Sequence, residues 1–107
     1  FKHNFENLDL DFVQKNMLLR ITQEFIQNSI KHSRCKNIFI DLNTSDESFW
    51  ELNIKDDGVG FDRSRITSNG IGLTNMKNRA EIIGADFSLE SQKNMGTTLN
   101  IILKKQP

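Results

Sequence analysis

The stretch Lys55-Asp56-Asp57-Gly58-Val59-Gly60-Phe61-Asp62 constrains this chain more than any other. It ends a run of alternating apolar and polar residues that is typical of a strand, and it places two adjacent acids, Asp56 and Asp57, directly before Gly58-Val59-Gly60. Glycine loses more backbone entropy on folding than any other residue, so its repeated use indicates a backbone that must approach something closely. An acid at the end of a strand, followed by Gly-x-Gly, therefore predicts a carboxylate beside a bound ligand.

Strand parity distinguishes the two acids. Trp50, Leu52 and Ile54 share one face of the predicted strand, and the same alternation puts Asp56 on that face and Asp57 on the other. We therefore expect Asp56 to point inward and Asp57 outward. A buried carboxylate needs hydrogen-bond donors, because an unpaired buried charge is very unfavourable, and a ligand NH group or an ordered water could supply them.

A long segment without Gly or Pro, residues 11–33, predicts a helix with an acid near its start. At about 100° per residue, one broad arc of this helix collects the residues expected to face the core. These are Leu18, Ile21, Thr22, Phe25, Ile26, Ser29 and Ile30. Beside the arc, Glu24, Asn28 and Lys31 form a narrow polar stripe at i, i+4 and i+7. Such a stripe can line a cleft, but taken alone it is more typical of an ordinary solvated face.

The remaining segments predict an antiparallel sheet. Residues 37–43 alternate and lead through a polar turn at 44–48 into the strand that ends at Asp56, which predicts a hairpin. Residues 85–91 alternate again, and residues 1–10 fit a short edge strand. In the last strand Thr97 shares a face with Leu99, Ile101 and Leu103, so its hydroxyl needs a partner, either a neighbouring carbonyl or a group in the site of Asp56.

Glycines also open the second predicted helix. Gly70-Ile71-Gly72-Leu73 follows a polar loop at 61–69 and leads into a helix over 74–83, which Gly84 ends. Free backbone NH groups at a helix start bind phosphate well, particularly where glycine permits close approach. A Gly-x-Gly alone usually marks only a turn, and its position before a helix favours the phosphate interpretation.

Bulk properties narrow the class of protein. The 107 residues fit one domain, 1–107, and the formal charge of zero gives no electrostatic reason for binding nucleic acid or a membrane surface. A single cysteine, Cys35, fits a reducing compartment. No segment reaches the roughly 20 apolar residues of a membrane span. Because the chain begins at Phe1 without a methionine, we expect it to be a piece of a longer protein.

The order of these motifs resembles the Bergerat ATP-binding fold of the gyrase, chaperone, histidine kinase and mismatch-repair superfamily. Within this superfamily the chain resembles a bacterial sensor histidine kinase, in the nitrate-sensor and membrane-fluidity-sensor branch. The residues that carry the resemblance are Arg20-Ile21-Thr22-Gln23-Glu24, Asn28, Lys31-His32, the Asp56–Asp62 stretch, and Gly70-Ile71-Gly72-Leu73 with Met76, Arg79-Ala80 and Gly84. The resemblance implies an α/β two-layer sandwich, with a mixed, mostly antiparallel sheet packed on helices. One departure is Ala85 after Gly84, where many relatives have a second glycine.

The resemblance also implies roles for individual residues. Asn28 would bind Mg2+, and Glu24 would bind its water shell or act as a base, with Lys31 and His32 near the phosphates of ATP. Asp56 would accept a hydrogen bond from the adenine amino group, and Thr97 would complete the adenine end through water. The remaining positions, at which the backbone would approach the nucleotide or its phosphates, are Gly58, Gly60, Gly70, Gly72 and Leu73. Residues 61–69 would form a short ATP lid.

By the same resemblance, the chain would donate the γ-phosphoryl group of ATP to a histidine on a separate dimerisation helix, because neither His3 nor His32 suits that role. Its partners would be that domain of the same protein and a response regulator. The isolated domain would be a cytoplasmic monomer without membrane contact, and the parent a membrane-bound homodimer. The alternatives are an anti-sigma factor serine kinase, which the Lys31-His32 pair and the stretch 72–80 fit less well, and a nucleotide-sensing module without transfer activity.

Overall fold

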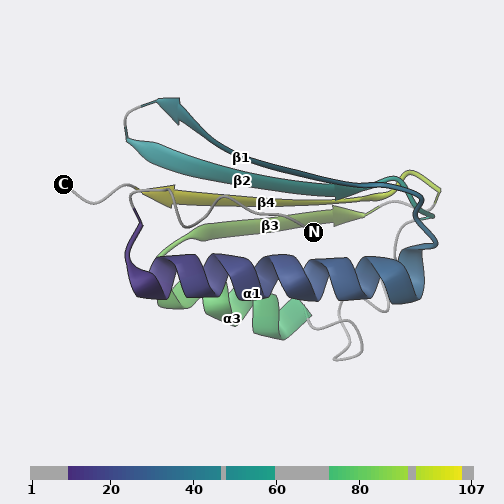
Figure 1. Ribbon diagram of the computed structural model, residues 1–107, viewed down its shortest axis with the longest axis horizontal. Coiled ribbons are helices and arrows are strands. Elements are labelled where there is room, and N and C mark those ends of the chain that lie inside the picture. The colour runs from purple at the N-terminus through teal and green to yellow at the C-terminus, as the bar shows by residue number, and fades with distance from the viewer. Residues whose placement is uncertain (1–9, 47, 60–72, 92–93, 105–107) are drawn as a thin grey trace.

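A computed structural model of the chain describes residues 10–46, 48–59, 73–91 and 94–104. It has two layers, a sheet and a layer of helices that covers one face of that sheet (Figure 1). The elements are α1 (Phe12–Asn28), the π-helix η2 (Ser29–Ser33), β1 (Ile38–Asp46), β2 (Phe49–Asp56), α3 (Leu73–Ile82), β3 (Asp86–Ser91) and β4 (Thr97–Lys104). The strand order is β1-β2-β4-β3, and all three pairings are antiparallel. This confirms the predicted two-layer class, and no parallel pairing of a mixed sheet occurs among the described strands.

The first helix starts where the sequence predicts. Asp11 is its N-cap and accepts a hydrogen bond from the backbone NH of Gln14, whose side chain in turn accepts from the backbone NH of Asp11, completing a capping box. The helix does not run to residue 33 in α-form, because a π-helical turn follows Asn28.

The predicted buried arc of this helix is correct except along one edge, where Ile26 is only half-buried and Ile30 is exposed. Leu18, Ile21 and Phe25 are fully buried against the sheet, whereas Ile30 is 70% exposed. Ile30 lies about 100° around the helix from Ser29, at the margin of the arc, and it falls where α-helical winding gives way to the π-helix. The prediction that Ile30 is buried was therefore wrong.

The predicted hairpin forms between β1 and β2, with Ile40 opposite Ile54 and Leu42 opposite Leu52. The first strand is longer than expected, because its pairing resumes after an irregularity between Asn43 and Asp46. The polar residues 44–46 thus belong to the strand instead of the turn. Strand β2 then pairs with β4 over its whole length.

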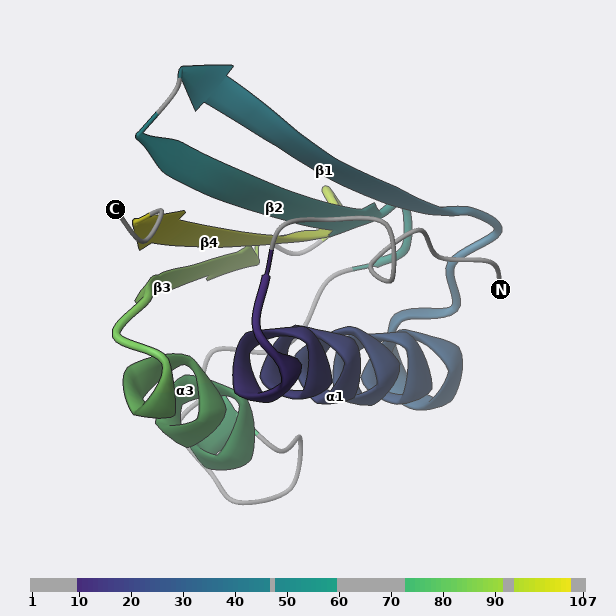
Figure 2. The same ribbon diagram turned by 60° about the vertical axis from the view of Figure 1, so that its left-hand side comes forward.

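The second helix runs beside the first under the sheet (Figure 2). Met76 and Ala80 are fully buried and form part of the hydrophobic core. Gly84 ends this helix with φ +67°, and the backbone NH of Ala85 bonds to the carbonyl of Ala80 across the turn. On the sheet, every second residue of β4 from Thr97 to Leu103 is buried, as predicted.

None of the helices in the described part of the chain has the length and apolar composition that a membrane span requires. The edge strand expected at 1–10 and the loop expected at 61–69 fall almost wholly outside the described residues, so both stay predictions.

Candidate functional site

Asp56 is the last residue of β2 and is fully buried on the helix side of the sheet, as strand parity predicted. Ser29 Oγ donates a hydrogen bond to Asp56 Oδ2 at 2.8 Å, and the backbone NH of Gly58 donates to Oδ1 at 3.0 Å. The protein itself therefore supplies donors to this carboxylate, where the sequence suggested a ligand or a water. Ser29 was predicted only as a core-facing residue, and the usable signal was that a serine hydroxyl on a buried face needs a partner.

The start of β4 lies directly against Asp56. Thr97 is opposite Asp56 in the strand register and is 1% exposed. Among the described residues its hydroxyl pairs with that of Ser91, with 2.8 Å between the two oxygens, a partner that the sequence did not suggest. Gly96 has φ +79°, and a Cβ built on it would overlap the carbonyl oxygen of Asp56. Glycine at this position therefore permits the two strand ends to touch.

Asp57 points away from the core, again as predicted, and it is exposed. Its Oδ1 accepts from the backbone NH groups of Lys36, at 2.8 Å, and Asn37, at 2.9 Å, while Oδ2 accepts from Asn37 Nδ2 at 2.9 Å. The hydrogen bonds from Asn37, backbone first and then side chain, hold the pKa of Asp57 below its ordinary value of 3.8. Asp57 thus ties the end of β2 to the segment that enters β1, a role the sequence did not reveal.

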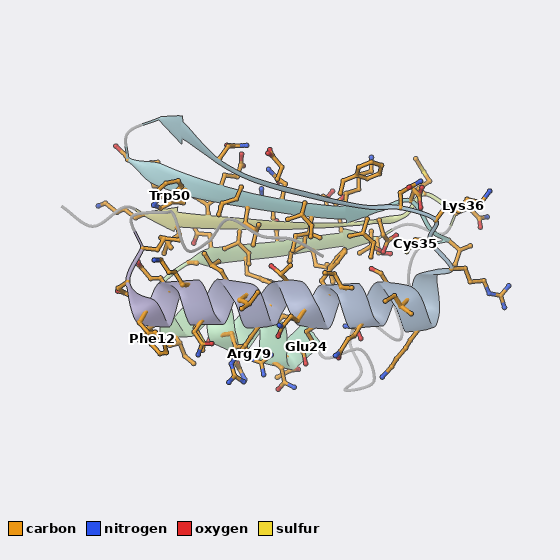
Figure 3. The ribbon with its side chains drawn as sticks, in the orientation of Figure 1. Phe12, Glu24, Cys35, Lys36, Trp50 and Arg79 are labelled. Carbon is orange, nitrogen blue, oxygen red and sulfur yellow. The ribbon has the colours of Figure 1, made fainter. Side chains whose placement is uncertain are left out.

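The polar stripe of α1 is not a uniformly solvated face. Asn28 is only 8% exposed, and the side chain of Glu24 is 22% exposed, whereas Lys31 is exposed. Arg79 of α3 donates from Nη1 to Glu24 Oε2 at 2.6 Å (Figure 3). At Glu24 the stripe therefore contacts the neighbouring helix. Arg79 lies near the predicted site, but it was not among the site residues that the sequence predicted.

The remaining predicted site residues are only partly described. Gly60, Gly70 and Gly72 lie outside the described residues, as do the side chains of His32 and Leu73. For the last two, the structure gives only the backbone, within η2 and at the start of α3.

The described residues fit a nucleotide and a magnesium ion. A fully buried carboxylate that is held in place accepts hydrogen bonds only, which suits recognition of an amino group. The amide oxygen of Asn28 and the carboxylate of Glu24 are oxygen ligands of the kind Mg2+ prefers, and Mg2+ usually takes only one or two protein ligands besides water and phosphates. No cluster of three or more His, Cys, Asp or Glu side chains placed to hold a metal occurs in the ranges that the structure describes.

A family model matches residues 14–107, nearly the whole chain. Its description is histidine kinase-, DNA gyrase B- and HSP90-like ATPase. The chain is also 34% identical over 99 residues to the sensor protein VraS of Staphylococcus saprophyticus, a match that covers 92% of this chain and 28% of VraS. An uncharacterized sensor-like histidine kinase of Chloroflexus aurantiacus is 30% identical over 108 residues, covering 92% of this chain and 18% of that protein. The chain therefore spans less than a third of the length of these relatives.

Solved structures agree on the fold. The blue-light activated histidine kinase of Erythrobacter litoralis EL346 superposes with a TM-score of 0.76 at 16% identity, over 90% of this chain and 32% of that one. The mycobacterial sensor histidine kinase MprB superposes with a TM-score of 0.68 at 22% identity, over 87% of this chain and 73% of that one. The matched family and the sheet packed on its helices agree: this chain is a histidine kinase-type ATPase domain and belongs to the histidine kinase-, DNA gyrase B- and HSP90-like ATPase family.

Proposed function

We propose that this domain binds Mg-ATP and donates the γ-phosphoryl group to a histidine on a separate dimerisation helix, as part of two-component signalling. The observation that carries the proposal is the fully buried carboxylate of Asp56, fixed between Ser29 and Gly58 and placed opposite Thr97. A protein does not keep an acid at such a position for the stability of its core, because burial disfavours the charge. A donor-bearing ligand explains it.

The adenine end of the site is formed by the two central strands. Asp56 accepts a hydrogen bond from the adenine amino group, and the hydroxyl of Thr97 reaches the base through water. Gly58 and Gly60 permit the backbone to approach the nucleotide. The hydrogen bonds from Ser29 and Gly58 support this role, because they fix the carboxylate before any ligand arrives.

The phosphate end is formed by the two helices. Asn28 binds Mg2+, Glu24 binds its water shell or acts as a base, and Lys31 and His32 lie near the phosphates. Gly70, Gly72 and Leu73 offer backbone NH groups at the start of α3. Phosphoryl transfer depends chiefly on positioning and charge neutralisation, and bound Mg-ATP supplies both the transferred group and the neutralising metal.

The whole protein then follows as a wider proposal. A dimerisation domain with the accepting histidine and a downstream response regulator are its partners, and the complete kinase is a homodimer with this domain on the cytoplasmic side of the membrane, where ATP is. The short matches within much longer sensor proteins support a larger parent. Assignment to the branch typified by nitrate and membrane-fluidity sensors rests on the motifs of the sequence.

The first test is calorimetric titration of the folded chain with ATP, in the presence and absence of Mg2+. We expect binding that Mg2+ strengthens, and we expect Asn28→Ala to abolish the Mg2+ effect while ATP alone still binds. Gln27→Ala is the matched control, because it removes an exposed amide from the preceding position of the same helix. Absence of ATP binding by the folded domain would refute the proposal, and an unchanged Mg2+ effect in Asn28→Ala would refute the metal assignment.

A further inference from the structure

We infer that Arg79 is a positioning residue for Glu24, and that it acts on phosphoryl transfer through that carboxylate. The inference rests on the proposed function and adds to it a residue from the second helix. Arg79 Nη1 lies 2.6 Å from Glu24 Oε2, and the contact joins residues 55 positions apart in the sequence. It is the only salt bridge found within the described parts of the chain.

The exposure of the pair argues against a purely structural role. The side chains of Arg79 and Glu24 are 26% and 22% exposed, so water still screens both charges. Ion pairs of this kind contribute little to folding stability. A charge-assisted hydrogen bond from a planar guanidinium nevertheless fixes the direction of a carboxylate. The effect expected from this contact is therefore on where the carboxylate of Glu24 lies.

The location of Glu24 makes that direction matter. Glu24 comes four residues before Asn28 on α1, which places the two side chains on the same side of the helix about 6 Å apart along its axis. A carboxylate has two oxygens and about four acceptor positions, so one hydrogen bond from Arg79 leaves acceptor capacity for a water of the metal shell. Arg79 can thus hold Glu24 beside Asn28 without preventing its proposed role.

Arg79 also connects that carboxylate to the other part of the phosphate end. It belongs to α3, which begins at Leu73 directly after the Gly70–Gly72 segment. The ion pair is a side-chain contact between the helix that carries Asn28 and the helix that follows the glycines (Figure 3). Any displacement of α3 relative to α1 would therefore be transmitted to the carboxylate of Glu24.

The test combines a measurement without nucleotide with transfer kinetics. In the nucleotide-free chain, we expect Arg79→Ala to shift the NMR signal of the Glu24 carboxyl carbon and to leave that of the exposed Glu81 unchanged. In autophosphorylation of the full-length kinase, we expect Arg79→Ala to lower kcat about tenfold while KM for ATP changes by less than about twofold. Arg79→Lys should restore only part of the loss, because it keeps the positive charge but not the planar guanidinium that sets the direction of the carboxylate. Lys77→Ala, which removes an exposed cation from the same helix, is the matched control.

A double-mutant cycle separates positioning from direct action. If Arg79 works through Glu24, then Arg79→Ala should have no further effect on kcat in a Glu24→Gln background. Additive losses would overturn the inference, since Arg79 would then act on the nucleotide itself. Normal ATP binding with kcat unchanged in Arg79→Ala would overturn the inference and leave the proposed function intact. Failure of the wild-type domain to bind ATP would overturn both.

Discussion

Asp56 and Asp57 are adjacent and chemically identical, yet the fold places them in opposite settings. Asp56 is fully buried and accepts two hydrogen bonds, from Ser29 Oγ and the backbone NH of Gly58. Asp57 is exposed and accepts three, from the backbone NH groups of Lys36 and Asn37 and from Asn37 Nδ2. Among the residues that the structure describes, the exposed acid therefore accepts more hydrogen bonds than the buried one.

This difference shows that the number of hydrogen bonds does not identify the functional acid. Asp57 uses its bonds to fasten one loop to the end of a strand, in water and at little desolvation cost. Asp56 lies fully buried on the core side of the sheet, where the neighbouring strand end approaches closely. A buried acid at the point where two strand ends meet is the stronger candidate for ligand binding, and three predictions test this comparison.

The largest effect is expected from Gly96→Ala. A Cβ at this position would overlap the carbonyl oxygen of Asp56, and the positive φ of +79° adds backbone strain. We expect the free energy of unfolding to fall by about 2 to 4 kcal/mol, and ATP binding to be lost because the end of β2 is displaced. Chemical denaturation and calorimetric titration measure the two effects.

Gly84→Ala is the matched control for this variant. Gly84 has a similar φ of +67°, but a Cβ there would have no atom within 4 Å. It should lower stability by only about 1 to 2 kcal/mol, from backbone strain alone, and leave ATP affinity unchanged. Equal losses in the two variants would show that contact with Asp56 is unimportant.

An intermediate effect is expected from Asp56→Asn. The substitution replaces a charged acceptor with an amide whose NH2 group cannot accept a hydrogen bond from adenine, Ser29 or Gly58. We expect the Kd for ATP to rise by about 10- to 100-fold, corresponding to about 1.4 to 3 kcal/mol, as measured by calorimetric titration. A Kd that differs from the wild-type value by at most about twofold would remove Asp56 from the proposed adenine site.

The smallest effect on ATP is expected from Asp57→Asn, with Kd changing by less than about twofold. Its effect should appear in stability as a function of pH. The folded pKa of Asp57 lies below its ordinary 3.8, because the bonds to Asn37 favour the carboxylate. The stabilisation is therefore fully present above about pH 5 and is lost as pH falls through the folded pKa.

Thermal unfolding of both proteins from about pH 6 down to about pH 2.5 measures this dependence. The Tm of the wild-type chain should exceed that of Asp57→Asn at the upper end, and the difference should shrink as the pH is lowered. A difference that grows on acidification would contradict the assignment. Loss of ATP binding equal to that of Asp56→Asn would contradict the distinction between the two acids.

The sequence predicted the parts of this structure that depend on local periodicity. Alternation placed Asp56 inward and Asp57 outward, and the same argument placed Thr97 on the face of β4 that points to the core. The start of α1 followed from an acid before a helical segment, and the end of α3 followed from Gly84. Each of these features is determined by neighbours within a few positions of the chain.

The features that the sequence did not predict depend on contacts between distant segments or on a change of helical winding. The bonds of Ser29 to Asp56 and of Arg79 to Glu24 join different elements, so no spacing along the chain identifies either pair. Ile30 was assigned to the core because a regular α-helix was assumed, but the helix changes to π-helical winding after Asn28 and Ile30 is exposed. The functional roles of all the predicted site residues stay predictions, and for Gly60, Gly70 and Gly72 so does their position.

The strand order β1-β2-β4-β3 has a consequence for how this domain acquires its activity. The strand nearest the C-terminus occupies an interior place in the sheet, between β2 and β3, and its first residue completes the surroundings of Asp56. Among the described strands, β4 comes last in the sequence, and β2 and β3 are joined into one sheet only through their pairing with it. Pairing between strands so far apart in the sequence is slow to form, so we expect the surroundings of Asp56 to be completed late in folding.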